Sequence, residues 1–100
     1  MEMIYNRLGR AGIKVSQLSF GSWVTFKSQV DVERAAEMLQ VARDAGVNFF
    51  DNAESYAGGE SERIMGEALR SLDWPRWSYL VSTKLFWGIR HDVKDRKSVV

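Results

Sequence analysis

A short apolar run between two stretches of helical periodicity constrains the fold of this chain more than any other feature. The run covers residues 47–50 and does not alternate apolar with polar side chains, which is typical of a parallel strand with both faces buried. The preceding helical stretch begins after Asp31, a residue type that caps helices, and ends at Gly46, where a helix C-terminus favours glycine. The following helical stretch ends at Trp74 and Pro75. The pattern therefore predicts strands that alternate with helices.

Both expected helices have one apolar stripe. The first stripe contains Val32, Ala35, Ala36, Leu39 and Ala42, and the second contains Ile64, Met65, Ala68, Leu69 and Leu72. Ser61 is a candidate cap for the second helix. A hairpin with a glycine-containing turn is expected at residues 4–15, and further strands at 18–20 and 79–83. A hairpin followed by β-α-β-α-β implies an α/β fold with a parallel sheet and right-handed crossovers.

The composition excludes several classes of protein. Lys and Arg number 14 against 13 Asp and Glu, and this net charge of +1 gives no electrostatic case for binding nucleic acid or an anionic membrane. The absence of cysteine excludes a disulfide scaffold and a thiolate metal site. The N-terminal segment lacks the apolar core of a secretory signal, and no run approaches the ~20 apolar residues of a membrane span. We therefore expect a cytoplasmic protein with no membrane partner.

Polar residues that could carry chemistry follow the ends of two expected strands. Asp51 follows the run at residues 47–50, and Lys84 follows the strand at 79–83. Because the carboxyl ends of parallel strands lie at one edge of a sheet, both side chains should emerge there and could form an ion pair. The structural alternative for Asp51 is an ordinary turn acid after a strand.

Tyr56 lies five residues after Asp51 and is the candidate proton donor. A free tyrosine has a pKa of about 10, so it exchanges protons poorly at neutral pH unless a nearby cation stabilises the phenolate. An exposed ammonium would contribute under ~1 kcal/mol, and a larger effect needs a dry pocket. Such a site would require Lys84 to lie against Tyr56, with Asp51 keeping the lysine charged and oriented. The alternative for Tyr56 is an aromatic side chain that packs in a loop.

Other residues have weaker claims to function. His91 is the only histidine and lies in a charged tail without further ligands at useful spacing, so no metal site is expected. Gly58 and Gly59 precede a helix and could receive a phosphate, although such a pair more often forms a turn. Trp23 and Trp87 either pack in the core or a lid, or form walls of a cofactor or substrate pocket.

Three segments of the sequence resemble the opening part of the aldo-keto reductases. They are RLGRAGIKVSQLSFGSWVTF, NFFDNAESYAGGESERIMGEAL and LVSTKLFWG. The resemblance is to the branch that includes the voltage-gated potassium channel β-subunits and their bacterial and plant relatives, and it covers residues 4–88 without a gap. Strand-end Asp51, Tyr56 five residues later and strand-end Lys84 form a highly specific combination within these flanks.

The resemblance implies the N-terminal portion of a (β/α)8 TIM barrel, with the hairpin closing its bottom. It also implies NADPH-dependent reduction of aldehydes or ketones, in which Tyr56 protonates the carbonyl oxygen and Lys84, paired with Asp51, favours the phenolate. The positions that match cofactor contacts are Ser22, Trp23, Gln29 and Asp51. The implied partners are thus NADP(H) and a small carbonyl substrate, and the branch makes a homo-oligomer conceivable for the full-length parent.

The resemblance further predicts how the chain is divided. Residues 1–16 would form the hairpin, 17–88 the first two βα units and the third barrel strand, and 89–100 a polar tail that no longer follows the family. A whole barrel needs ~250 residues, and the family's fourth catalytic residue, a His or Asn, lies on the fourth strand. We therefore expect a fragment, truncated after the third strand and inactive alone. Two alternatives stay open, a non-catalytic NADP(H)-sensing module like a channel β-subunit and an inert truncated gene product.

Overall fold

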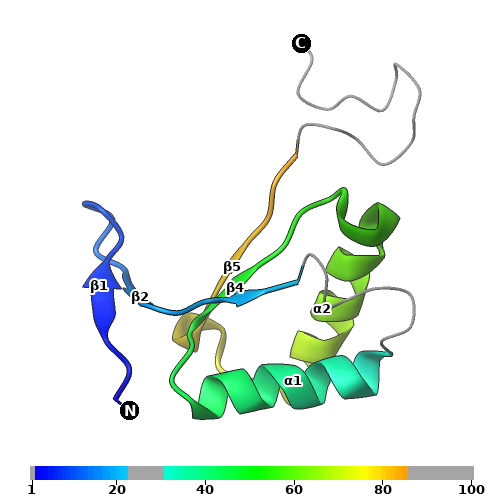
Figure 1. Cartoon of the computed structure of the whole chain (residues 1–100), viewed down its shortest axis with the longest axis horizontal. Coiled ribbons are helices and arrows are strands. Elements are labelled where there is room, and N and C mark those ends of the chain that lie inside the picture. Colours follow the sequence, from blue (N-terminus) through cyan, green and yellow to red (C-terminus); the bar gives the residue numbers. More distant parts are fainter. Residues whose placement is uncertain (1, 23–30, 86–100) are drawn as a thin grey trace.

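The computed structural model describes residues 2–22 and 31–85. Figure 1 shows a hairpin near the end of a parallel sheet where its strands begin, and two helices that pack against the sheet. The hairpin consists of β1 (Tyr5–Arg7) and β2 (Lys14–Ser16), and the sheet of β3 (Phe20–Gly21), β4 (Phe49–Asp51) and β5 (Leu80–Ser82). The helices are α1 (Val32–Asp44) and α2 (Glu60–Leu72), with short 3-10 turns η1 (Tyr56–Gly59) and η2 (Arg76–Ser78). The predicted alternation of strands and helices is confirmed.

The sheet has the order β3-β4-β5, and both pairs of strands are parallel. The strands are shorter than expected, and β3 and β4 start two residues later than the apolar runs at 18–20 and 47–50. Leu18 is 53% exposed and lies outside the pairing. Asp51 was expected after β4 but is its last residue, because it pairs with Gly21 on one side and with Ser82 on the other.

Helix α1 begins and ends as the sequence predicts. The Asp31 carboxylate accepts a hydrogen bond from the Arg34 amide at 2.8 Å, and so caps the helix. Gly46 follows the helix with φ 101°, a conformation that residues with a side chain rarely adopt. A Cβ on this glycine would lie 2.8 Å from the Met3 Cβ, and the Tyr5 hydroxyl donates to the Gly46 carbonyl at 2.6 Å. Close approach of the N-terminal segment therefore also requires glycine here.

Helix α2 begins differently from the prediction. It starts at Glu60 after Gly59, which has a left-handed conformation with φ 95° and provides no side-chain cap. Ser61 is therefore the second residue of the helix, and its proposed capping role is wrong. Its side chain is fully buried, and its hydroxyl has no hydrogen-bond partner among the described residues. No side-chain cap precedes this helix in the described part of the chain. The turn η1 ends at Gly59 and is followed immediately by the first residue of α2, Glu60.

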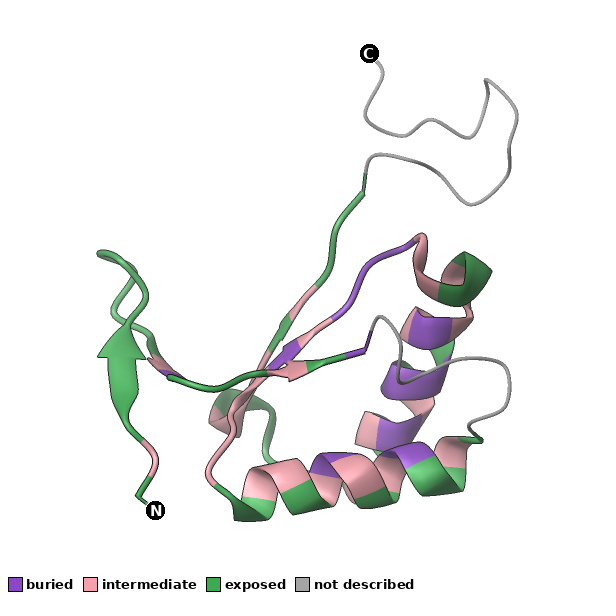
Figure 2. Cartoon of the chain, in the orientation of Figure 1, coloured by how far each residue is buried: buried purple, intermediate pink, exposed green. Residues whose placement is uncertain are grey.

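The core lies between the sheet and the two helices. Figure 2 shows the buried residues on the helix faces toward the strands and on β4. Phe50 is fully buried, and its ring lies 5.6 Å from that of Trp74 and 6.4 Å from that of Tyr79. The other members of the buried cluster are Ala35, Leu39, Ile64, Met65 and Ala68. Phe49 and Asp51 lie on the other face of β4 and are half-buried, so only one face of this strand is covered by the described residues.

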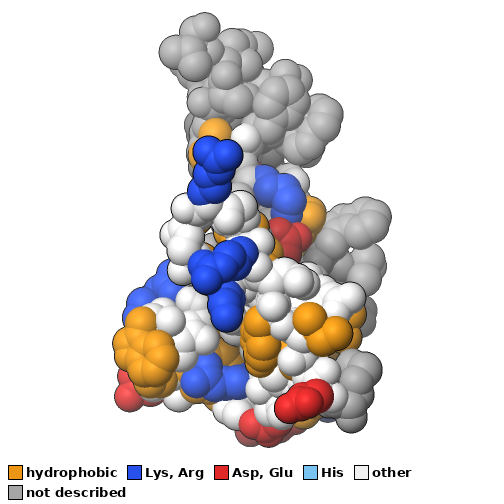
Figure 3. Space-filling view, turned by 90° about the vertical axis from the view of Figure 1, so that its left-hand side faces the viewer, with side chains coloured by type: hydrophobic (Ala, Val, Ile, Leu, Met, Phe, Trp, Pro, Cys, Tyr) orange, Lys and Arg blue, Asp and Glu red, His pale blue; other side chains and the backbone are white. Residues whose placement is uncertain are grey.

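A single asparagine joins the hairpin to the start of β4. The Asn48 side chain accepts from the Ser16 amide at 2.8 Å and donates to the Lys14 carbonyl at 3.0 Å. The Asn48 amide in turn donates to the Ser16 hydroxyl at 3.1 Å. Figure 3 views the hairpin end of the molecule, where Lys and Arg side chains are interspersed with hydrophobic ones. The hairpin is thus attached through polar contacts and leaves much apolar surface exposed, including Ile4, Leu8 and Ile13.

Neither helix in the described part of the chain is long and apolar enough to cross a membrane.

The unpartnered hydroxyl of Ser61 leads to a stability prediction. Ser61→Ala should raise the free energy of unfolding by about 1 kcal/mol, because it removes a buried hydroxyl that has no partner within residues 2–22 and 31–85 and favours the helix. Urea denaturation of the full-length protein, followed by circular dichroism, measures this change. Ser71→Ala is the matched control, because Ser71 lies on the same helix but is exposed, with its hydroxyl bonded to the Ala68 carbonyl. Equal effects of the two substitutions would contradict the prediction.

Candidate functional site

Three consecutive strands bring their polar residues to one edge of the sheet. Ser22 follows β3, Asp51 ends β4, and Lys84 lies two residues beyond β5. The strands are parallel and in register at Gly21, Asp51 and Ser82, so their carboxyl ends meet at this edge. The chain remains paired beyond the strands, because the Asn52 amide donates to the Ser82 carbonyl at 2.8 Å. The sheet alone therefore places these side chains near one another.

The Lys84 ammonium lies at the centre of the site. Its Nζ is 2.8 Å and 2.9 Å from the two oxygens of the Asp51 carboxylate. It also donates to the Asn52 carbonyl at 2.7 Å and to the Tyr56 hydroxyl at 3.3 Å. The structure thus brings together the three residues that the sequence nominated for catalysis, and it adds the carbonyl of Asn52.

The carboxylate of Asp51 is held from several sides. The Ser82 hydroxyl donates to Oδ1 at 2.6 Å, while the ammonium of Lys84 spans both oxygens. Ser22 is fully buried, and its hydroxyl donates to the main-chain carbonyl of Asp51 at 2.7 Å. Ser22, predicted to contact a cofactor, therefore also connects β3 to β4 at the site.

The ion pair changes the pKa of both partners. Partial burial raises the pKa of the Asp51 carboxyl, but hydrogen bonds from Lys84 and Ser82 and the lysine charge lower it by more, so the net pKa lies below its ordinary 3.8. The hydrogen bond to Asp51 raises the pKa of the Lys84 ammonium above its ordinary 10.5, against a smaller effect of desolvation. The lysine is consequently a cation at neutral pH, and its 53% exposed side chain also favours the charged form.

Tyr56 reaches the lysine from the turn η1. The turn contains left-handed residues at Ala57, with φ 52°, and at Gly58, with φ 63°. A left-handed alanine is uncommon and often marks a constrained functional segment. The Lys84 Nζ lies 5.0 Å from the centroid of the Tyr56 ring, in addition to the hydrogen bond with its hydroxyl. A phenol that is hydrogen-bonded to a cation can donate its proton to a reacting oxygen.

The sequence reasoning missed Asn52. Its main-chain carbonyl makes the shortest of the four contacts of the Lys84 ammonium, and its side chain is almost fully buried at 2% exposure. An asparagine directly after a strand-end acid reads as an ordinary turn residue. The sequence feature that could have drawn attention to Asn52 is its position directly after Asp51, in the segment that connects β4 to α2.

Several other predicted site residues lie outside the described part of the chain. These are Trp23, Gln29, Trp87 and His91. Gly58 and Gly59 belong to the turn before α2, in agreement with the structural interpretation of this pair. Within residues 2–22 and 31–85, no three His, Cys, Asp or Glu side chains cluster in a way that could hold a metal ion.

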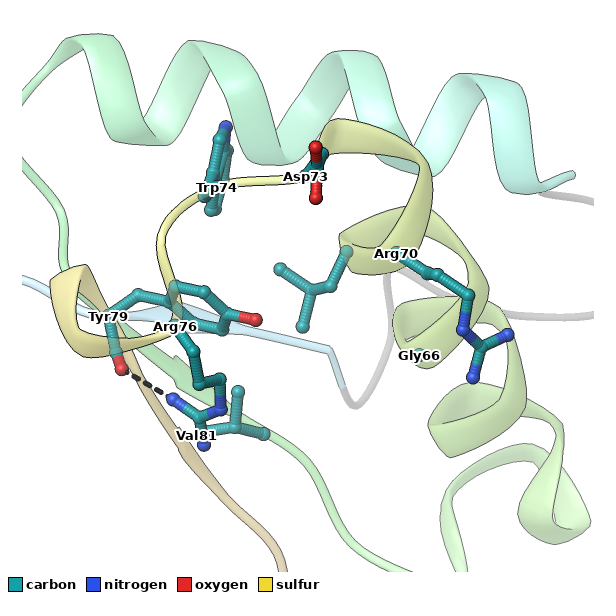
Figure 4. A pocket seen from close by; sticks show the side chains of 8 residues that line it. Gly66, Arg70, Asp73, Trp74, Arg76, Tyr79 and Val81 are labelled. Atoms are coloured by element: carbon teal, nitrogen blue, oxygen red, sulfur yellow. Dashed lines mark hydrogen bonds between the residues drawn. The ribbon is translucent and has the colours of Figure 1, made fainter.

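A cavity of about 340 Å³ lies elsewhere, between α2, the η2 turn and β5. Figure 4 shows its lining side chains and the hydrogen bond from Arg76 to the Tyr79 carbonyl. The lining residues are Gly66, Leu69, Arg70, Asp73, Trp74, Arg76, Tyr79 and Val81. None of the residues around the Lys84 ammonium lines this cavity, so we do not assign it to the candidate site.

Comparison with known proteins gives consistent results. A sequence model of the Aldo/keto reductase family matches residues 17–99. A probable voltage-gated potassium channel subunit beta from Oryza sativa subsp. japonica is 63% identical over 86 residues, which is 86% of this chain and 26% of that protein. A protein of the same name from Arabidopsis thaliana is 59% identical over the same lengths. The chain thus spans about a quarter of the curated relatives that it matches.

Solved structures resemble the fold as well. A thermostable aldo-keto reductase in complex with the inhibitor epalrestat has a TM-score of 0.72 and 30% identity, over 84% of this chain and 31% of that one. An aldo-keto reductase from Bacillus halodurans in its holo form has a TM-score of 0.67 and 29% identity, over 85% of this chain and 26% of that one.

The ion pair gives a prediction that does not depend on activity. In Lys84→Met, we expect the pKa of the Asp51 carboxyl to rise above its value in the unchanged protein, because burial then acts without the opposing lysine. NMR titration of the carboxyl carbon of Asp51 measures this. Lys14→Met, which changes a lysine of the hairpin, is the control and should leave the titration unchanged. An unshifted Asp51 titration in Lys84→Met would show that the ion pair does not form in solution.

The pKa shifts of Asp51 and Lys84 determine the pH range in which their ion pair stabilises the fold. The pKa of Asp51 is lowered on folding, so the contribution is present above the ordinary value of 3.8 and is lost as the pH falls through the folded pKa. The raised pKa of Lys84 sets the alkaline limit, because the contribution is lost as the pH rises past the ordinary 10.5 and through the folded pKa. Lys84→Met should therefore destabilise the protein at pH about 7 and have little effect at pH about 2.

Proposed function

The chain belongs to the aldo/keto reductase family, and from this premise we propose that the protein reduces aldehydes or ketones with NADPH, using Tyr56 as the proton donor. One observation supports this most strongly. A single ammonium, that of Lys84, contacts both the Asp51 carboxylate and the Tyr56 hydroxyl. This arrangement suits a reaction in which an oxygen gains negative charge and must be protonated.

In the proposed reaction, each residue has a separate task. NADPH, when bound, supplies the hydride that adds to the carbonyl carbon. The Tyr56 hydroxyl hydrogen-bonds the carbonyl oxygen and transfers its proton to it, which completes the alcohol. Lys84 then stands beside the phenolate that remains, because its Nζ lies 3.3 Å from the Tyr56 hydroxyl oxygen. Asp51 keeps the lysine charged and fixes its direction.

The described residues fit the nicotinamide end of NADP(H) in their chemistry. The charges of Asp51 and Lys84 compensate each other, so the site suits an uncharged dihydronicotinamide ring more than a phosphate. Ser22 lies buried beside Asp51 and would hold this end of the cofactor. We propose Trp23 and Gln29 as further contacts on the grounds of the family resemblance. No metal takes part in the proposed reaction.

We also propose that the three-stranded sheet is part of a (β/α)8 barrel. Parallel order and helices on one face are what such a barrel requires of each βα unit. The chemistry needs an enclosed site, since water would screen the lysine charge. The side chain of Lys84 is 53% exposed, so enclosure would have to come from outside the described residues.

The names of the plant relatives favour a second candidate function. They are described as probable voltage-gated potassium channel subunits beta. Together with the NADP(H) binding that the family resemblance implies, this leads us to propose, as the alternative, a module that binds NADP(H) and reports its redox state to a partner without turnover. The same three residues would then shape the nicotinamide site. Binding without catalysis separates this function from the first.

Tyr56→Phe tests the proposed function in the purified full-length protein. We expect NADPH-dependent reduction of a panel of aldehydes and ketones to fall at least ~100-fold, because the general acid is lost. The affinity for NADPH, measured by quenching of tryptophan fluorescence, should remain similar. Tyr79→Phe is the matched control, since it removes a hydroxyl from a tyrosine of the core and should retain activity.

The outcomes separate the candidate functions. Turnover that survives Tyr56→Phe would contradict the role of Tyr56. Saturable NADPH binding without turnover of any carbonyl in the unchanged protein would favour the sensing module. The absence of both NADPH binding and carbonyl turnover in the unchanged protein would support an inert product.

A further inference from the structure

We propose that Asn52 is a positioning residue, which holds the Lys84 ammonium beside Tyr56 by fastening the end of β4 to helix α2. The catalytic consequence of this role rests on the proposed function. The geometric role does not, because it concerns only contacts between residues of this chain. Asn52 contributes through its main chain, which contacts Lys84 and Ser82, and through its side chain, which contacts helix α2.

The main-chain contact limits where the ammonium can lie. An ammonium has three N–H donors, whereas Nζ of Lys84 has four oxygen neighbours. The Asn52 carbonyl takes the shortest contact, at 2.7 Å, and the Tyr56 hydroxyl the longest, at 3.3 Å. If one N–H of the ammonium points to the Asn52 carbonyl and a second to the Asp51 carboxylate, the third can point toward the Tyr56 hydroxyl. The carbonyl therefore sets the direction of the ammonium.

The side chain of Asn52 fixes that carbonyl in space. Its Nδ2 donates to the Ser61 carbonyl at 3.2 Å and lies 3.5 Å from the Met65 sulfur, both in α2. Its Oδ1 accepts from the Ala53 amide at 2.9 Å. The side chain is 2% exposed, so water cannot easily replace these partners. This amide links the strand end to the first two turns of the helix.

The peptide is held from the sheet as well. The Asn52 amide donates to the Ser82 carbonyl at 2.8 Å, and the Glu54 amide donates to the Lys84 carbonyl at 3.1 Å. The segment after β4 thus remains paired with the segment after β5, while the Asn52 side chain ties it to α2. Loss of the Asn52 side chain would remove the contacts with α2 and leave the contacts with the segment after β5. The peptide between residues 52 and 53 would then be less restricted in its orientation. The ammonium would then turn toward Asp51, and the long contact with Tyr56 would be lost first.

The first experiment reads the lysine directly and needs no activity. The full-length protein is labelled with limiting acetic anhydride, and mass spectrometry compares the acetylation of Lys84 with that of Lys14 in the hairpin. In Asn52→Ala we expect the relative reactivity of Lys84 to rise about threefold, because the main-chain carbonyl of residue 52, which stabilises the charged ammonium, is no longer held in place by the Asn52 side chain. Asn52→Ser is a milder second variant, which can still accept from the Ala53 amide but is too short to reach Ser61.

Ser61→Ala is the control for this experiment. It keeps the Ser61 carbonyl that Asn52 bonds and removes only a hydroxyl that has no partner among the described residues. The reactivity of Lys84 should stay unchanged in this variant. Unchanged reactivity of Lys84 in a folded Asn52→Ala or Asn52→Ser protein would overturn the proposal, and so would an equal rise in Ser61→Ala.

The second experiment tests the catalytic consequence. In Asn52→Ser, kcat should fall about tenfold while KM and the NADPH affinity change little, because only the orientation of the ammonium is affected. Equal loss of NADPH binding and of kcat would indicate general unfolding and would contradict a positioning role. If the unchanged protein reduces no carbonyl, the proposed function fails, and the labelling of Lys84 still decides the role of Asn52.

Discussion

The pairing register of β4 determines where the polar groups at the carboxyl edge of the sheet lie. This strand is the central one, and its last residue, Asp51, pairs with Gly21 on one side and Ser82 on the other. Side chains alternate between the two faces of a strand, so a slip of one residue would carry Asp51 to the helix side and Phe50 to the open side. The burial of Phe50 against α1 and α2 resists such a slip. Apolar packing thus fixes the position of the carboxylate.

The same alternation separates stability from chemistry along a single strand. Phe50 makes aromatic contacts in the core, with Trp74 and Tyr79, whereas the Asp51 carboxylate contacts Ser82 and Lys84 at the carboxyl edge of the sheet. The two side chains are neighbours in the sequence and lie in separate environments. The site can therefore hold a paired charge at partial exposure, because the buried apolar cluster lies on the other face of the strand.

Much of this arrangement could be predicted from sequence, for identifiable reasons. Helix α1 and the contact between Asp51 and Lys84 follow from periodicity and from the rule that parallel strands end at one edge. The start of α2 was misjudged, because a left-handed Gly59 replaces the side-chain cap that Ser61 suggested. Asn52 was overlooked, because its function depends on a main-chain carbonyl and on burial against α2, neither of which leaves a pattern in the residues. The exposure of one face of β4 also depends on tertiary covering that local sequence does not encode.

Gly46 connects the hairpin to this central strand in a way that reaches beyond its turn. Its left-handed conformation and its contact with Met3 arise from different causes, one from the backbone and one from a distant segment. The left-handed conformation and the close approach of Met3 both require a residue without a Cβ at position 46. Strand β4 begins at Phe49, three residues after Gly46. Asn48, whose side chain accepts from the Ser16 amide of the hairpin, lies between them. The start of β4 and the attachment of the hairpin therefore depend on one short segment, residues 46–49, so a substitution there would disturb both.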